Sequence, residues 1–224
     1  MSRRAVVIGV VVVAVLAGGA VAVDAVARDR VEARIAAEVA AGFGLESEPD
    51  VEIAGTTFLP QVLGGSVETV RVSADAATIG TLPMEEVTVT LTGVSAREPY
   101  VADAVDFTGL VPLAAAQEQV PEELELRIED GAVLVGASVL GLPLEVTATP
   151  VADGRAVVAR VDALSLGGLT VQVTDLPESV AQTIDGIRVP IDGLPESMTL
   201  TSVTATEAGF QVEATGTEVA LTSS

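Results

Sequence analysis

The chain has 224 residues, of which 32 are acidic and 11 are basic, and its net charge at pH 7 is −21. This length fits one domain of about 200 residues plus a short extra segment, and a hydrophobic content of 49% excludes an intrinsically disordered chain. All 11 basic residues are arginines, and His, Cys, Lys, Asn and Trp do not occur. The acidity argues against nucleic-acid binding, which depends on basic side chains that neutralise phosphates.

The missing residue types also exclude most kinds of catalytic site. Without His or Cys the chain forms no Ser-His-Asp triad, no Cys-His nucleophile and no ordinary zinc site. Without Lys it forms neither a Schiff base nor a P-loop. A carboxylate pair of the glycosidase type remains, but no pair stands out among the 32 acidic residues. We therefore predict a protein that is not an enzyme and uses no cofactor and no metal, with a carboxylate hydrolase as the weaker alternative.

The N-terminal segment predicts a location outside the cytoplasm. Arg3 and Arg4 precede residues 5–23, a run of 19 residues without a charge, which is long enough to cross a hydrocarbon core of ~30 Å as a helix. Arginines on the N-terminal side predict that the chain after this run faces the extracytoplasmic, periplasm-like space. We predict that residues 1–23 are an uncleaved single-pass anchor in the cell membrane. A signal sequence cleaved near the small residues 20–22 is the alternative.

Residues 24–224 are predicted to form a single extracytoplasmic domain that begins with an amphipathic helix. Over residues 24–41 an apolar residue recurs every four positions: Ala27, Val31, Ile35 and Val39. This spacing is typical of a helix with one apolar side, and Asp24 and Arg28 are placed for an ion pair between successive turns.

Beyond this helix, apolar and polar residues alternate, which indicates β-strands. The alternating segments are residues 67–73, 87–92, 124–129, 144–149, 157–161, 198–206 and 210–214. Turns are predicted at residues 130–131, 153–154 and 208–209, and residues 112–119 and 177–184, which begin with proline, are predicted short helices. A weak echo between residues 81–88 and 141–147 fits either recurring strand entries or a duplicated half-domain. The predicted fold class is α+β: the anchor helix runs into the amphipathic helix, which packs on a strongly twisted, mostly antiparallel sheet of the lipid-binding groove type.

Two features are candidates for an apolar binding site. Phe58, Leu59 and Leu63 occupy a connecting segment that ends in two glycines, and they are predicted either to line a lipid site or to pack in the core. The apolar strand faces, rich in Val, Leu, Ile and Ala, suit acyl chains better than flat rings, with a fully packed core as the alternative. The dense acidic cluster of residues 122–130 lacks the spacing of a calcium loop and is interpreted as a solvated strand face. A lipid phosphate has six candidate partners: Arg71, Arg97, Arg127, Arg155, Arg160 and Arg188.

Several motifs occur in an order that carries a resemblance. They are Asp24-x-x-x-Arg28, Pro49-Asp50-Val51-Glu52-Ile53, Phe58-Leu59-x-Gln61-x-Leu63-Gly64-Gly65, Val70-x-Val72-x-Ala74-Asp75, Leu91-x-Gly93-Val94, Leu200-Thr201-Ser202-Val203 and Gly209-Phe210-x-Val212-x-Ala214-Thr215-Gly216. Together with the basic start and apolar helix, this order resembles the LmeA-like phospholipid-binding proteins of the actinobacterial cell envelope, over nearly the whole chain. The resemblance implies binding of phospholipid, of the phosphatidylinositol type, and a part in lipoglycan maturation. It carries over no catalytic motif.

We therefore predict a non-enzymatic protein of the cell envelope that presents or transfers phospholipid for glycolipid maturation. The alternative is a membrane-tethered structural or protein-interaction module with no lipid ligand. Residues 24–224 keep nine arginines and all 32 acidic residues, a net charge of −23. Such a domain gains no attraction to an anionic membrane surface, so the N-terminal helix is predicted to hold it at the cytoplasmic membrane by raising its local concentration.

Overall fold

The computed structural model describes residues 23–37, 39–40, 45, 47–55, 57–79, 82–139, 141–175, 187–191 and 194–221. The predicted anchor or signal segment, apart from Val23, and the predicted helix of residues 177–184 lie outside the described residues. Within the described residues, no helix is long and apolar enough to cross a membrane.

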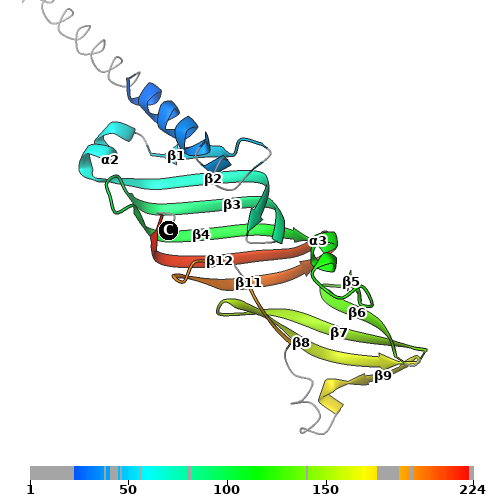
Figure 1. Ribbon diagram of the computed structural model, residues 1–224. Coiled ribbons are helices and arrows are strands. Elements are labelled where there is room, and N and C mark those ends of the chain that lie inside the picture. Colours follow the sequence, from blue (N-terminus) through cyan, green and yellow to red (C-terminus); the bar gives the residue numbers. More distant parts are fainter. Residues whose placement is uncertain are drawn as a thin grey trace, which may run out of the picture.

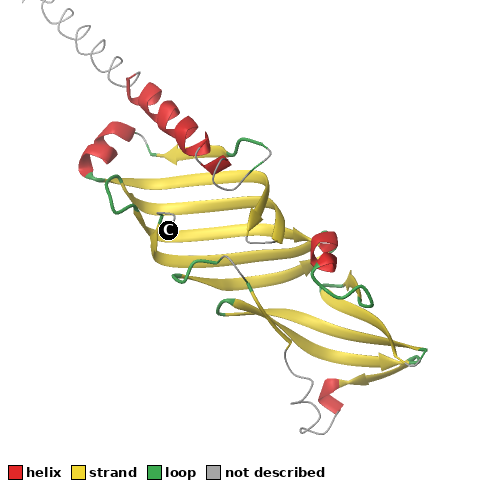
Figure 2. Ribbon diagram, viewed as in Figure 1, coloured by secondary structure: helices red, strands yellow, loops and turns green. Residues whose placement is uncertain are grey.

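The described residues form twelve strands in two six-stranded sheets, and every strand pairing is antiparallel (Figure 1 and Figure 2). In spatial order, the first sheet consists of β1 (Asp50–Ala54), β2 (Ser66–Ile79), β3 (Leu82–Ser95), β4 (Val101–Pro112), β12 (Gly209–Ala220) and β11 (Met198–Thr206). The second consists of β10 (Ile187–Pro190), β8 (Ala156–Leu166), β7 (Leu142–Asp153), β6 (Ala132–Val139) and β5 (Glu125–Glu129), with β9 (Leu169–Gln172) also paired to β8. The fold is thus of the predicted α+β kind, with mostly antiparallel β-sheet and few helices.

The sequence predicted one sheet, and this part of the prediction is wrong. Neighbouring strands rotate by about 20–25° relative to each other, and open sheets of more than ~10 strands tend to curl or split. The twelve strands accordingly form two sheets, which meet where β7 lies beside β11. At this junction the backbone N–H of Leu200 donates to the carbonyl of Gly154 (2.7 Å). Ala152 and Val157 of the second sheet pack against the core of the first, so the apolar faces of the two sheets meet on the same side.

The predicted N-terminal helix is present and covers one end of the first sheet (Figure 1). It packs through Ala27, Ile35 and Ala36 against a core cluster that contains Ile53, which is 2% exposed. Val31, predicted on the same side, is 37% exposed. The side that packs runs instead through Asp24, Arg28, Glu32 and Ala36, which are buried or half-buried.

Three polar residues of this helix, one per turn, bind the neighbouring edge of the fold. Asp24 and Arg28 form the predicted ion pair (3.7 Å), and Arg28 Nη2 donates to the carbonyl of Gly55 (2.9 Å). Glu32 Oε1 accepts a hydrogen bond from the backbone N–H of Ile53 in the edge strand β1 (2.7 Å). An unpaired edge strand invites pairing with other chains, and the helix covers this one.

Shorter helices lie at both ends of the first sheet. α2 (Phe58–Gly64) precedes β2 and ends at Gly65, whose φ of 98° requires the left-handed conformation that glycine adopts without strain. α3 (Leu113–Glu118) confirms the helix predicted at residues 112–119 and buries Ala115. A 3₁₀ turn, η1 (Val173–Asp175), follows β9. The N-terminal helix and α2 therefore cover the apolar face of the first sheet beside β1. α3 packs against the same face where β4 ends.

Candidate functional site

A row of apolar side chains crosses five strands of the second sheet. Leu126 of β5 pairs with Val135 of β6, which pairs with Val146 of β7; Val146 pairs with Leu164 of β8, which pairs with Val171 of β9. Directly paired residues in neighbouring strands project to the same side of a sheet. These five residues therefore form one continuous apolar row.

Further apolar residues lie on the same side of the second sheet, on either flank of the row. They are Ile128, Val133, Ala137, Leu142, Leu144, Ala148, Val157, Ala159, Val161, Leu166, Leu169 and Val189. We call this set and the row together the apolar face of the second sheet.

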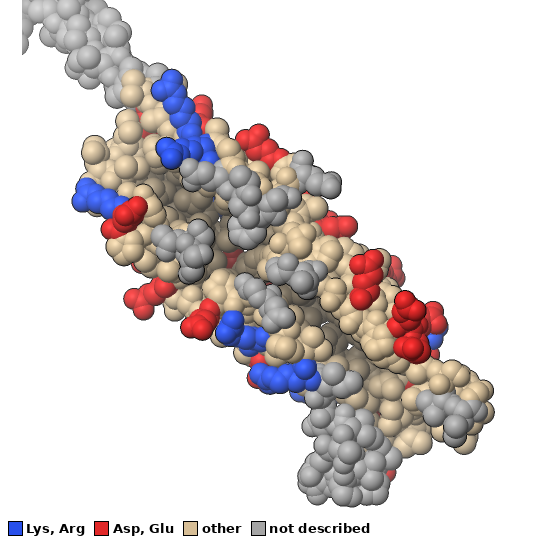
Figure 3. Space-filling view, viewed as in Figure 1, with Lys and Arg blue, Asp and Glu red and all other residues tan. Residues whose placement is uncertain are grey.

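Among the described residues, this apolar face is exposed mainly near the β8–β9 turn, whereas Leu126, Val135, Val146 and Leu164 of the row are half-buried. Leu169 is 78% exposed, Leu142 50%, Leu166 46% and Val171 41%, whereas the small residue Ala148 is buried. In the first sheet the corresponding face is a packed core that includes Met84, Val105 and Leu200. Figure 3 shows a surface hollowed along the length of the molecule, where the visible walls are mostly uncharged. The second sheet therefore offers apolar surface that neither the N-terminal helix, α2 nor α3 covers.

The opposite face of the second sheet carries charged and hydrogen-bonding residues. Arg127 pairs with Glu145 (2.6 Å), Arg188 pairs with Asp153, and Thr149 donates to Asp162 (2.7 Å). Arg71 of the first sheet similarly pairs with Glu52 (3.6 Å). Three of the six arginines considered for a lipid phosphate are thus engaged with carboxylates.

Arg155 occupies a different position, in the β7–β8 turn where the two sheets meet. Its guanidinium donates to the carbonyl of Leu194, and its own carbonyl accepts from the N–H of Ile191 (3.0 Å). Ile191 and Leu194 both pack against the core of the first sheet. Arg155 therefore places a positive charge beside the junction of the two apolar faces.

The predicted lipid-binding residues all lie on α2, but they point to different surroundings. Phe58 is 4% exposed and belongs to the core cluster under the N-terminal helix. Leu59 is partly buried and packs against the same cluster, whereas Leu63 is 79% exposed. The segment is a short helix rather than an irregular connection, and it lies at the end of the first sheet away from the second sheet (Figure 1). A role of these three residues in lipid binding stays a prediction.

The start of α2 is held by a residue that no local pattern would identify. Asp24 of the N-terminal helix accepts hydrogen bonds from the backbone N–H of Phe58 (2.9 and 2.8 Å to its two oxygens) and of Leu59 (2.6 Å). These bonds hold the pKa of Asp24 below its ordinary value of 3.8; burial opposes the shift, and Arg28 lowers the pKa further. Asp24 thus takes the place of an N-cap residue, since Thr57 makes no side-chain cap bond.

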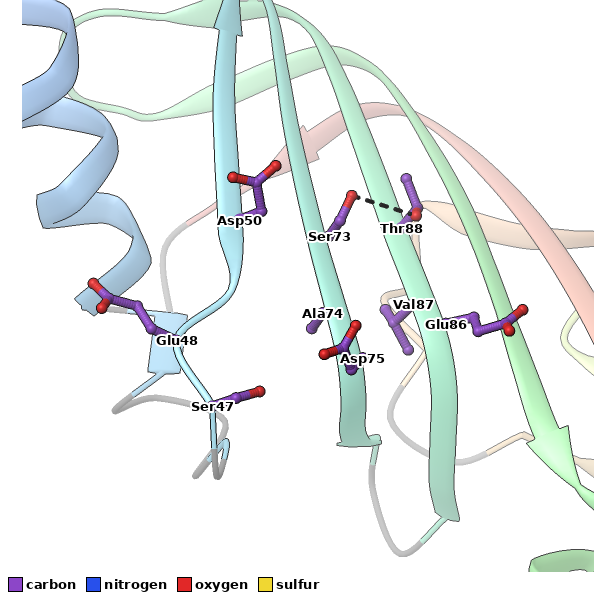
Figure 4. Close-up of a pocket in the computed structure, with 9 residues that line it drawn as sticks. All are labelled: Ser47, Glu48, Asp50, Ser73, Ala74, Asp75, Glu86, Val87 and Thr88. Atoms are coloured by element: carbon purple, nitrogen blue, oxygen red, sulfur yellow. Dashed lines mark hydrogen bonds between the residues drawn. The ribbon is translucent and has the colours of Figure 1, made fainter.

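A polar pocket of about 350 Å³ lies between the start of β1 and the hairpin of β2 and β3. Its lining includes the carboxylates of Glu48, Asp50, Asp75 and Glu86, which spread apart rather than converge (Figure 4). The described residues contain no group of acidic side chains arranged to hold a metal ion. Four carboxylates would repel a phosphate headgroup, so this pocket does not suit a phospholipid.

The apolar strand faces were one of the two predicted candidate sites, but nothing in the prediction said which of these faces stays uncovered, and the sequence contained a signal for it. Residues 124–172 were predicted to contain strands and turns, with no helix among them, so this stretch supplies no element of its own to cover an apolar face. The structure agrees, with β5 to β9 following one another in hairpins. The predicted turn at Asp130-Gly131 is confirmed, and both residues have the positive φ (52° and 79°) that a tight hairpin turn requires.

Comparison with known proteins adds one match. The family model described as LmeA-like phospholipid-binding matches residues 22–215, which include the N-terminal helix and the strands of both sheets except the end of β12. Neither the curated proteins nor the solved structures contain a match. Because the match spans most of its length, the chain belongs to the LmeA-like phospholipid-binding family.

Proposed function

We propose that the protein holds the acyl chains of a phospholipid on the apolar face of the second sheet, and that it presents or transfers this lipid in the cell envelope. The observation that carries the proposal is a partly exposed apolar face in a chain of a phospholipid-binding family. An acyl chain that leaves a bilayer needs apolar surface in place of its lipid neighbours. The face supplies such surface without catalytic groups.

The dimensions of the face match an acyl chain. Strands lie ~4.8 Å apart, so the row from Leu126 to Val171 spans roughly 19 Å across five strands. Half of a hydrocarbon core of ~30 Å, the share of one leaflet, is about 15 Å. One acyl chain therefore fits along the row. The residues of the row are aliphatic, which suits a flexible chain better than a planar ligand.

The phosphate of the headgroup is proposed to lie at the junction of the two sheets. Arg127 and Arg188 are paired on the side opposite the apolar face, whereas Arg155 lies where the two apolar faces meet. A lipid with its acyl chains on the face would place its phosphate at an edge of that face, near a positive charge. The headgroup proposed from the family resemblance is of the phosphatidylinositol type.

The cellular setting proposed here follows from the N-terminal sequence. Residues 5–23 anchor the chain in the cell membrane, and the domain faces the extracytoplasmic space. A protein with 32 acidic residues gains nothing from an anionic surface, so the tether keeps it near its lipid source. Presentation for envelope glycolipid maturation is the proposed purpose.

The test uses two neighbouring residues of β9 that project to opposite sides. Val171 belongs to the apolar row, and Thr170 is exposed on the other side. An unpaired carboxylate in an apolar site is strongly disfavoured, so Val171→Asp should lose phospholipid and Thr170→Asp should retain it. The full chain is purified, its fold is checked by circular dichroism, and bound phospholipid is quantified by mass spectrometry. Val146→Thr, which adds a hydroxyl to the middle of the row at similar volume, is a second and milder variant.

The outcomes separate the proposal from its alternative. Wild-type protein with stoichiometric phospholipid, which is depleted in Val171→Asp and retained in Thr170→Asp, supports a lipid carrier. A folded wild-type protein that carries no phospholipid and takes none from added vesicles contradicts it, and would return the chain to a structural or protein-interaction role.

A further inference from the structure

Two hairpin turns meet at the end of the second sheet that is remote from the N-terminal helix (Figure 1). One joins β6 to β7 through Gly141, and the other joins β8 to β9 through Gly167 and Gly168. The N–H of Gly167 donates to the carbonyl of Pro143 (3.0 Å), and Leu142 Cδ2 lies 3.9 Å from the position that a Cβ atom on Gly167 would take. We call these two turns and their flanking residues, 141–144 and 164–170, the tip.

The tip is apolar and uncharged in a strongly acidic chain. Leu142, Leu166 and Leu169 are its most exposed large residues, and Leu166 pairs directly with both Leu144 and Leu169. Residues 141–144 and 164–170 contain no Asp, Glu or Arg, although the whole chain carries 32 acidic residues. Large apolar side chains that project into water are unfavourable. An exposed patch of them usually marks a surface that contacts a membrane or another molecule.

We propose that the tip docks on the surface of a phospholipid bilayer by inserting its leucines among the lipids. This inference rests on the function proposed above, because the tip continues the apolar face through Leu144, Leu164 and Leu166. A lipid that enters from the docked bilayer would reach the face along apolar side chains, without crossing water.

The charge and the size of the tip favour a bilayer over a protein partner. A stable protein interface usually buries about 800 Å² on each side and includes hydrogen bonds, whereas the tip is two narrow turns with leucine side chains. Bilayer hydrocarbon requires no directional contact, only apolar surface. Because the tip carries no acidic residue, anionic headgroups do not repel it.

The chain contains no Trp, so a single introduced Trp reports its own surroundings without background. Leu169→Trp places this probe at the tip, and Thr199→Trp places it on an exposed position of β11 in the first sheet. The full chain is reconstituted in vesicles of phosphatidylcholine brominated on the acyl chains, which quench Trp fluorescence on contact. We expect strong quenching and a blue shift for Leu169→Trp and little change for Thr199→Trp. Equal quenching of the two probes, or none, overturns the proposal.

Two further variants separate docking from lipid binding. Adding Leu142→Asp and Leu166→Asp to the Leu169→Trp protein should lower the fraction of its Trp that the bilayer quenches roughly tenfold or more, since each leucine loses its burial in hydrocarbon. Adding Val171→Asp instead should abolish lipid retention and leave the quenching intact, which shows that the quencher is in the bilayer and not in a bound lipid. Loss of quenching in the Val171→Asp protein overturns the docking proposal. So does a blue shift of Leu169→Trp in vesicle-free solution that rises with protein concentration, because it identifies a second copy of the chain as the partner.

Discussion

Phe58 and Leu63 share one short helix and provide a sharp test of where the apolar residues of that helix act. Phe58 is 4% exposed within the core cluster of the N-terminal helix, β1 and β2, whereas Leu63 is 79% exposed. Truncating a buried Phe to Ala typically costs about 3–5 kcal/mol in the free energy of unfolding. Truncating an exposed side chain usually changes it by less than about 0.5 kcal/mol. We expect Phe58→Ala to fall in the first range and Leu63→Ala in the second.

The assay is thermal unfolding of the full chain followed by circular dichroism. A change of 1 kcal/mol shifts the midpoint by about 2–4 °C in a protein of this size, so Phe58→Ala should melt roughly 6–20 °C lower than the wild type. Lipid retention per folded molecule should be unchanged in both variants. A small melting shift for Phe58→Ala accompanied by loss of phospholipid would refute the assignment of Phe58 to the core and restore it as a lipid-binding residue.

Two contacts and the proposed lipid site can each be tested by one further change. The pKa of Asp24 in the folded protein lies below its ordinary value of 3.8. The stability that its bonds contribute is therefore complete above pH 3.8 and is lost as the pH falls through the folded-state pKa. Asp24→Asn should remove this acid-dependent change in melting temperature. Arg127→Met breaks an exposed pair with Glu145, so we expect a stability loss of at most ~1 kcal/mol and unchanged lipid retention by mass spectrometry. Stripping bound phospholipid with detergent should lower the melting temperature, and adding phospholipid back should restore it.

The strands were predictable where each apolar residue is large and its neighbours are polar. Residues 198–206 were predicted with the bounds that β11 has, and residues 87–92 lie within β3. β4 was missed although it lies between β3 and β12 in the middle of the first sheet. Its inward side includes Ala102 and Gly109, which are too small to produce a visible alternation, and its pairing with distant residues decides its conformation.

Contacts between distant segments limited the prediction of the site. Asp24 was identified as an ion-pair partner of Arg28, but its bonds to Phe58 and Leu59 join residues 34 and 35 positions apart. The same holds for the apolar face of the second sheet. Each of its strands shows an apolar side in sequence, yet which sides are covered depends on where the helices pack. Burial of Phe58 and exposure of Leu169 are both consequences of that packing.

The most direct test of the central claim is to locate the acyl chain on the second sheet. A phosphatidylcholine with a diazirine in its acyl chain is bound to the full chain and activated by light, and the labelled residues are identified by mass spectrometry. We predict labels at Val135, Val146 and Leu164, with the intervening positions Leu134, Thr147 and Ser165 unlabelled, because alternate residues of a strand project to opposite sides. Labels concentrated on α2, or on the acidic pocket beside β1, would contradict the account.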